Sequence, residues 1–358
     1  MSGNIVIFGP SGLVGGAALR HFDALSDWNV TALSRRPPAF AHGARFIALD
    51  LTDRAACERT LGELADTTHI IYTALYEEED VIQGWRAKAQ METNLAMLQN
   101  ALRPLDAVAQ NLAHISLFQG TKAYGAHLRS PPVPARERWA RNDHENFYWY
   151  QEDFVKDQQE GKAWGWTIWR PQTIFGFALD APLNILLAMA VFAVIRRAEG
   201  LPLCHPGGGP YVTEAIDTRL IARGLDWATA AGGARDEIFN ITNGDSITFP
   251  GLWPTLARHF DMPMGEPEPM RLQDVMPTKV HIWEELAKQH NLRSVPYDKL
   301  AGQSWQFADF MFAAGKNPAP VVVSTIKLRQ HGFQDCIDTE DMLIELLEQY
   351  QAEGILPR

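Results

Sequence analysis

The sequence predicts an α/β fold, a doubly wound parallel sheet joined to a mostly helical C-terminal part. Three observations support this prediction. The first half alternates short apolar runs with longer helical patterns, a glycine-rich turn follows the first apolar run, and residues 251–358 lack the strand alternation. Nearly continuous apolar runs are typical of strands that helices cover on both faces, as in parallel sheets.

The predicted elements follow one another along the chain. Runs of β-branched or apolar residues predict strands, and stretches with helical periodicity predict helices. Strands are expected at 4–8, 29–33, 45–49, 69–74, 113–117, 167–170 and 238–242, and helices at 13–25, 54–64, 81–102, 183–197, 281–290 and 339–350. The helix at 183–197 is apolar enough to be either a buried core helix or a wall of a substrate pocket.

The charge of the chain limits its partners. The 358 residues include 32 Lys and Arg against 43 Asp and Glu, which gives a net charge of −11. We therefore expect neither nucleic acid nor an anionic membrane as a partner. The longest apolar run, 185–195, is also shorter than the roughly 20 residues that a bilayer requires. The acidic cluster Glu77-Glu78-Glu79-Asp80 is interpreted as a solvated loop that leads into a helix N-terminus.

The cysteines and histidines predict no metal site. Cys57, Cys204 and Cys336 are far apart and outside any C-x-x-C spacing, so neither a disulfide framework nor a thiolate site is expected, and a reducing cytoplasm fits. The 11 histidines are scattered and form no H-E-x-x-H or H-x-H pattern.

The turn after the first strand predicts a dinucleotide site on a Rossmann-type sheet. The segment Gly9-Pro10-Ser11-Gly12-Leu13-Val14-Gly15-Gly16 has the spacing G-x-x-G-x-x-G and opens a helix. Glycines allow a tight turn and a close pyrophosphate, while the helix N-terminus offers free N–H groups to the phosphates. The cofactor contacts expected here are Gly9, Ser11, Gly12, Leu13, Val14 and Gly15.

The ends of the second and third strands favour NADP(H) over NAD(H). Ser34, Arg35 and Arg36 stand where the cofactor ribose would lie, and no acidic residue is there to accept from a 2′-hydroxyl. A guanidinium can hold a 2′-phosphate, although either arginine could instead be a plain surface residue. Asp50 and Leu51 would bracket the adenine, unless Asp50 caps the next helix.

Further cofactor contacts are expected at the carboxyl ends of later strands, because ligands of open α/β sheets bind there. The candidates are Thr73, Ala74, Leu75, Gln119, Pro171 and Ile174. We accordingly expect 1–180, with 205–248 returning to it, to form an NADP(H)-binding Rossmann domain. Residues 181–204 and 249–358 would form the substrate-binding part.

A lysine and several tyrosines follow the strand at 113–117. An ammonium near a phenol favours the phenolate and polarises the hydroxyl, which can then stabilise an oxygen that gains negative charge during hydride transfer. Short-chain dehydrogenases normally supply this pair as Y-x-x-x-K. Here Tyr124, Tyr148 and Tyr150 are each followed at the fourth place by another residue, so the lysine must come from a different segment.

Three ordered segments resemble a known family. They are 120–125 (GTKAYG), 146–153 (NFYWYQED) and 170–176 (RPQTIFG), and 239–245 and 324–327 add to the similarity. They look like segments of the progesterone 5β-reductase and iridoid synthase family, atypical extended short-chain dehydrogenase/reductases. By position, the resemblance implies Lys122 and Tyr148 as catalytic residues. Trp149 replaces the second tyrosine of the family motif, and Ala123 stands where the plant proteins carry histidine.

The resemblance implies NADPH-dependent 1,4-reduction of the activated C=C bond of a small apolar enone or enal, with Tyr148 and Lys122 stabilising the enolate. Two alternatives remain open. One is an NADPH-dependent carbonyl reductase of the extended short-chain dehydrogenase type, because an oxygen-activating tyrosine serves both reactions. The other is a regulator that senses NADP(H) without catalysis. Homodimer formation is also left open.

Overall fold

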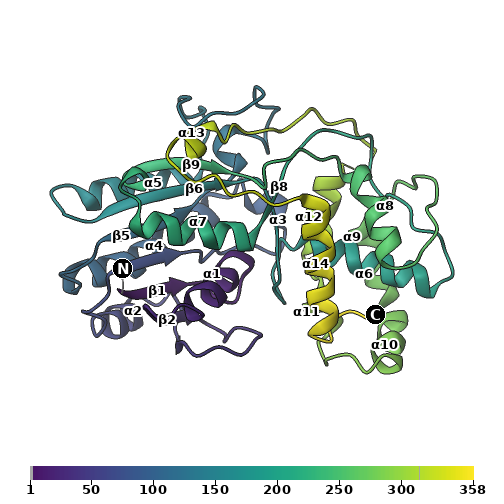
Figure 1. The fold of residues 1–358 in the computed structure, drawn as a ribbon, viewed down its shortest axis with the longest axis horizontal. Coiled ribbons are helices and arrows are strands. Elements are labelled where there is room, and N and C mark those ends of the chain that lie inside the picture. Colours follow the sequence, from purple (N-terminus) through teal and green to yellow (C-terminus); the bar gives the residue numbers. More distant parts are fainter. Residues whose placement is uncertain (1–2, 314) are drawn as a thin grey trace. The chain divides into compact units, whose positions relative to one another are not determined.

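The computed structural model describes residues 3–313 and 315–358, which form two compact units (Figure 1). Unit 1 comprises Met1–Gln172, Thr218–Ile241 and Val323–Asp335. Unit 2 comprises Thr173–Asp217, Thr242–Val322 and Cys336–Arg358.

Unit 1 contains a seven-stranded parallel sheet in the order β3-β2-β1-β4-β5-β6-β9. The strands are β1 (Gly3–Phe8), β2 (Trp28–Ser34), β3 (Arg45–Ala48), β4 (His69–Tyr72), β5 (His114–Phe118), β6 (Gly165–Pro171) and β9 (Glu237–Ile241). The chain builds the sheet outward from β1 in one direction and then from β4 in the other. The doubly wound parallel fold is confirmed, and its strand order reverses between β1 and β4, where such sheets bind ligands.

Helices cover both faces of this sheet. α1 (Leu13–Asp23) contacts α7 (Thr218–Ala230), whereas α4 (Lys88–Val108) contacts α2 (Arg54–Leu61) and α5 (Phe147–Gln159). On β1, Val6 and Phe8 join the core with α2, α4 and α5, while Ile5 and Ile7 are buried as well. Burial of both faces is the reason that the strands read as continuous apolar runs.

Two local features differ from the prediction. The helix expected at 81–102 is divided into α3 (Val81–Gly84) and α4, because α3 ends at Gly84 and Ala87 adopts an extended conformation as the N-cap of α4. In addition, β7 (Thr173–Phe175) and β8 (Ala215–Asp217) form a separate parallel pair in unit 2. Strands of three residues are too short for hydrophobic periodicity to reveal.

Unit 2 is mostly helical and packs around one apolar helix. Its helices are α6 (Ile185–Ala198), α8 (Phe249–His259), α9 (Leu272–Val275), η3 (Met276–Lys279), α10 (Val280–Gln289), α11 (Tyr297–Leu300), α12 (Ser304–Phe312) and α14 (Thr339–Ala352). α6 is buried from Ile185 to Arg196 and contacts α8, α10 and α12. Its N-cap Asn184 accepts from the Leu187 N–H and donates to the Tyr350 hydroxyl. Among the described helices, none combines the length and the hydropathy that a membrane crossing requires.

The unit boundaries differ from the expected domains. Residues 205–217 and 242–248 lie in unit 2, because β8 pairs with β7 and not with the large sheet. Residues 323–335 lie in unit 1, because α13 (Ile326–Gln330) contacts the edge strand β9. The short helices η1 (Thr121–Tyr124) and η2 (Gly232–Ala234) also belong to unit 1.

Candidate active site

The glycine-rich turn at the end of β1 brings several predicted cofactor residues together. Gly9 has a φ of +82°, which glycine adopts readily, and its N–H donates to Leu33 O at 3.0 Å. A Cβ at Gly9 would lie 2.9 Å from Ala74 N, and a Cβ at Gly15 would overlap Gly9 O. Thr73 Oγ1 donates to Phe8 O at 2.6 Å. The close approach of the turn to the end of β4 therefore excludes side chains at both glycines.

The N-terminus of α1 fits a phosphate group. The N-cap residue Gly12 has no side chain to occupy the first N–H groups of this 11-residue helix. A Cβ at Gly12 would meet only Gly9 O, at 3.5 Å, so the space beside it is open. Ser11, Leu13 and Val14 are partly exposed around it. These N–H groups, together with the positive end of the helix dipole, can bind the pyrophosphate of a dinucleotide.

An arginine follows the end of β2, and an aspartate follows the end of β3. Arg35 is exposed just beyond β2, and its positive charge lowers the pKa of Asp50. Hydrogen bonds from Thr52 N and Oγ1, at 2.9 and 2.8 Å, hold the pKa of Asp50 below its usual value. Asp53, not Asp50, caps α2 by accepting from Ala56 N.

The neighbouring positions behave differently from Arg35. Ser34 Oγ donates to Arg36 O at 2.5 Å, so this hydroxyl stabilises the turn after β2. Arg36 is exposed, and Leu51 is buried in the core of unit 1. An adenine ring could therefore contact the exposed surface at Asp50 more easily than the buried side chain of Leu51.

Lys122 and Tyr148, which are 26 positions apart in the sequence, meet at the carboxyl end of β5. The Lys122 Nζ lies 5.7 Å from the centroid of the Tyr148 ring. Asn146, the N-cap of α5, connects the two segments, because its Oδ1 accepts from Tyr148 N and its Nδ2 donates to Lys122 O. The beginning of α5 thus fixes the distance between the lysine and the tyrosine.

The environment leaves a neutral phenol close to an ammonium. Burial raises the pKa of Tyr148, and the charge of Glu77 raises it further, while the charge of Arg170 opposes this. Burial lowers the pKa of Lys122 to about 8, although Glu77 opposes that shift. A Cβ at Gly120 would lie 3.3 Å from the Tyr148 hydroxyl, so the glycine leaves space beside this group. At neutral pH the pair can donate hydrogen bonds and positive charge to an oxyanion.

A buried polar network lies behind this pair. Arg170 Nε donates to Gln119 Oε1 at 2.7 Å, and Gln119 Nε2 donates to Glu152 Oε2 at 2.9 Å. Burial raises the pKa of Glu152, but hydrogen bonds from Lys156, Arg141 and Gln119 outweigh it and bring the pKa to about 2. Glu152 lies one helical turn after Tyr148 on α5, so the network orients the helix that carries the tyrosine. Both the oxygen and the nitrogen of the Gln119 amide are hydrogen-bonded within this network, although Gln119 is predicted to contact the cofactor.

The tyrosine that follows Lys122 belongs to the same network. Tyr124 is buried, donates to Asn240 Oδ1 at 2.6 Å and accepts from Arg170 Nη1 at 3.3 Å. Asn240 Nδ2 in turn donates to Ala135 O and Ser324 O. The segments that carry the family resemblance therefore meet in one hydrogen-bond network, in which Tyr124 is structural.

The remaining predicted cofactor residues lie in different places. Leu75 follows β4 and is 40% exposed, and Pro171 is the last residue of β6. Ile174 lies in β7 of unit 2, where it pairs with Ile216. Every other candidate site residue belongs to unit 1.

Sequence reasoning missed Glu77. The sequence predicts a solvated loop for the acidic cluster at 77–80, and this prediction is wrong for Glu77. Glu77 is half-buried, and its Oε2 accepts from Gln90 Nε2 at 2.7 Å. Burial raises its pKa, while the positive charge of Lys122 lowers it. Only the position of Glu77, shortly after the carboxyl end of a central strand, could have pointed to the site.

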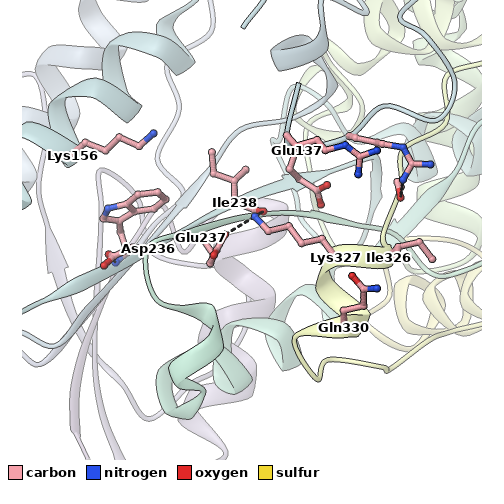
Figure 2. A pocket seen from close by; sticks show the side chains of 12 residues that line it. Glu137, Lys156, Asp236, Glu237, Ile238, Ile326, Lys327 and Gln330 are labelled. Carbon is pink, nitrogen blue, oxygen red and sulfur yellow. Dashed lines mark hydrogen bonds and ion pairs between the residues drawn. The ribbon is translucent and has the colours of Figure 1, made fainter. Parts of the chain in front are cut away.

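A separate groove of about 380 Å³ lies along the outer edge of β9 (Figure 2). Figure 2 shows Lys327 of α13 reaching Glu237, and its Nζ also donates to Ile238 O at 2.9 Å. Glu137 Oε1 accepts from Asn240 N at 2.9 Å. These side chains form hydrogen bonds with backbone groups that an edge strand would otherwise leave unpaired. The polar residues of the groove therefore have a structural role.

No metal centre was found among the described residues: no three or more His, Cys, Asp or Glu side chains gather in a way that could hold an ion. The three cysteines are free, with Cys57 and Cys204 buried and Cys336 exposed.

The fold and the glycine turn define a Rossmann-fold protein. Solved structures share this fold: UDP-glucose 4-epimerase of Thermotoga maritima, solved with UDP-glucose, matches with a TM-score of 0.69 and 15% identity over 98% of this chain and 99% of that chain. The UDP-glucose 4-epimerase of Thermus thermophilus, solved with NAD, matches with a TM-score of 0.68 and 16% identity over 97% and 99% of the two chains.

A family model described as PRISE-like Rossmann-fold domain matches residues 54–314. The (S)-8-oxocitronellyl enol synthase of Nepeta racemosa is 30% identical over 98% of this chain and 92% of that protein. The 3-oxo-Delta(4,5)-steroid 5-beta-reductase of Arabidopsis thaliana shows the same identity and coverage. The chain belongs to the PRISE-like family, which confirms the resemblance drawn from the sequence.

Proposed function

We propose that this protein uses NADPH to reduce the activated C=C bond of a small apolar enone or enal. The observation that carries the proposal is the position of the Lys122 ammonium, 5.7 Å from the centroid of the Tyr148 ring, just after the carboxyl end of β5. The named steroid reductase among its relatives supports this reaction class. Unit 2, with its large apolar core, is assigned the substrate-binding role.

The chain's own residues would stabilise the charge that develops on the substrate. Bound NADPH would supply the hydride, which adds to the β-carbon of the enone. The π electrons then move to the carbonyl oxygen, where Tyr148 donates a hydrogen bond and Lys122 contributes positive charge. The α-carbon afterwards takes a proton from Tyr148 or solvent, which gives the saturated carbonyl compound.

The preference for NADPH is assigned to Arg35. The proposal is supported by the exposure of Arg35 just beyond β2 and by the influence of its charge on the pKa of Asp50, because a guanidinium there could bind a 2′-phosphate bidentately. The free cysteines fit a reducing compartment, and we assign the protein to the cytoplasm on that basis.

A carbonyl reductase is the second candidate, because the same hydroxyl could activate an oxygen for direct 1,2-addition. The two reactions give different products from one substrate. Reduction of 2-cyclohexenone at the C=C bond yields the saturated ketone, whereas reduction at the carbonyl yields the allylic alcohol.

The test is NADPH oxidation by the purified protein with 2-cyclohexenone or progesterone, followed by product identification. We expect saturated ketones. Tyr148→Phe and Lys122→Ala should each lower turnover by about 100-fold or more while NADPH still binds. Tyr150→Phe is the matched control, because its hydroxyl lies near Glu145 and outside the Lys122 contacts. Equal turnover in all three variants would remove the assignment, and NADPH binding without oxidation across a broad enone panel would favour the sensing regulator.

A further inference from the structure

The Lys122 ammonium lies among aromatic rings. Its Nζ is 4.3 Å from the centroid of the Trp85 ring and 5.7 Å from those of Phe147 and Tyr148. Ring faces attract a cation, but they replace only part of the hydration that burial removes. Within the described chain no carboxylate forms an ion pair with this ammonium at 4.0 Å or less.

Glu77 is a half-buried carboxylate in the loop whose Trp85 ring covers Lys122, and Gln90 of α4 holds it in place. Gln90 of α4 is 1% exposed, donates from Nε2 to Glu77 Oε2 and accepts at Oε1 from the backbone N–H of Glu78. A Cβ at Gly84 would overlap Gln90 Oε1, so the loop packs closely against this amide. The same loop carries Trp85, which covers Lys122. The carboxylate and the ring are therefore held by one short segment.

The other acidic side chains near the site have different partners. Asp80 caps α3 by accepting from Gln83 N, and Glu145 accepts from the Tyr150 hydroxyl. Glu152 is engaged by Lys156, Arg141 and Gln119. Glu79, two positions after Glu77, is exposed.

We propose that Glu77 is the counter-ion of Lys122 and a positioning residue for the reaction, which keeps the ammonium charged beneath Trp85 and beside Tyr148. Only the catalytic role of Glu77 rests on the proposed function, because the effect of its charge on Lys122 requires neither substrate nor cofactor. A negative charge at a fixed place near a buried ammonium favours its protonated form.

The groups that face Lys122 determine whether loss of the Glu77 charge raises or lowers the pKa of this lysine. Glu77 raises the pKa of Lys122, and it also raises the pKa of Tyr148. The other facing groups are His127, whose pKa is lowered to about 4 by burial first and then by Lys122, and His144, whose pKa is also lowered by burial. Both imidazoles are neutral at neutral pH and so do not stabilise the ammonium.

Two cations lie further out. Arg86 donates to His127 O, and Arg170 acts on Tyr148 from the network behind it. Arginine side chains cannot be deprotonated in proteins, so a cation of this kind adds no titration step of its own. Removal of the Glu77 charge must therefore lower the pKa of Lys122 below about 8 and shift the alkaline limb of activity to lower pH.

The first readout does not depend on catalysis. Competitive acetylation of the full-length protein with acetic anhydride at a series of pH values, followed by peptide mass spectrometry, gives the pKa of Lys122. Glu77→Gln keeps an acceptor for Gln90, and we expect it to lower this pKa by about one unit. Glu77→Asp keeps the charge, so the pKa of Lys122 in this variant should lie close to that of the unmodified protein. Glu79→Gln removes one charge from the same loop and should leave the Lys122 titration unchanged.

The second readout is the pH profile of kcat/KM for enone reduction. In Glu77→Gln we expect the alkaline limb to move to lower pH by the shift that acetylation measures, with the cofactor Kd unchanged. An identical Lys122 titration in Glu77→Gln and Glu79→Gln overturns the inference. Absence of enone reduction in the unmodified protein refutes the proposed function instead, and the acetylation result then still decides whether Glu77 is the counter-ion.

Discussion

Two tyrosines of the segments that resemble the family have different surroundings in the structure. Tyr124 follows Lys122 by two positions, yet its hydroxyl donates to Asn240 and accepts from Arg170 inside the fold. Tyr148 lies on α5 with its hydroxyl beside the space at Gly120. A hydroxyl whose donor and acceptor positions are both taken is suited to holding structure, whereas one that faces open space can bind a substrate oxygen.

We expect one residue, Arg35, to decide the cofactor preference. Arg35→Ala removes the guanidinium expected to bind the 2′-phosphate, and charge-assisted hydrogen bonds of this kind are worth about 1.5–3 kcal/mol. We expect the Kd for NADPH to rise by about 10- to 100-fold while the Kd for NADH stays nearly constant. Fluorescence titration with each nucleotide measures both constants.

Arg36→Ala serves as the comparison for that measurement, because Arg36 is exposed at the next position. It should change NADPH binding less than Arg35→Ala. Equal losses of affinity for NADPH and NADH in Arg35→Ala would show that this guanidinium does not bind the 2′-phosphate.

At the scale of the element, the contact between the β1 turn and α1 has no room for a side chain. Gly15→Ala places a Cβ against Gly9 O, so α1 must move away from the turn. Alanine has the higher helix propensity by about 1 kcal/mol, but the overlap is with backbone and cannot be relieved by a rotamer change. We expect a net destabilisation of about 1–3 kcal/mol in urea unfolding and weaker NADPH binding.

Gly232→Ala is the matched control for this substitution. A Cβ at Gly232 would meet nothing within 4 Å, and the residue has no positive φ. Its stability and cofactor affinity should remain close to those of the unmodified protein. A Gly15→Ala variant with unchanged nucleotide affinity would show that the position of α1 does not govern the phosphate site.

At the scale of the whole molecule, buried histidines make the fold sensitive to acid. Burial lowers the pKa of His69 and His205 to about 4 and that of His114 to about 3. In the unfolded chain histidine titrates near about 6.5. The unfolded state therefore binds protons first as the pH falls, and stability that is fully present above about 6.5 is lost progressively toward about pH 4.

Urea unfolding followed by tryptophan fluorescence between about pH 7.5 and about pH 5 measures this loss. His114→Gln should reduce the dependence of the unfolding free energy on pH, because it removes one of the titrating groups. His290→Gln, at an exposed position on the surface of unit 2, should not change it. Stability that is constant over this range would contradict the assignment of these histidines as buried neutral groups.

Local sequence patterns are sufficient to predict the parallel sheet, the nucleotide turn and the family. Each of these depends on short-range patterns: apolar runs such as residues 4–8, the glycine spacing from Gly9 to Gly15, and the ordered segments around Lys122 and Tyr148. Which polar groups share an environment is known only from the three-dimensional fold. Tyr124 is engaged by Asn240, and Asp53 is the helix cap. Glu77 is half-buried against Gln90 in the loop that covers Lys122, where its charge raises the pKa of that lysine. Burial and through-space charge depend on segments far apart in the chain, and no local pattern carries that information.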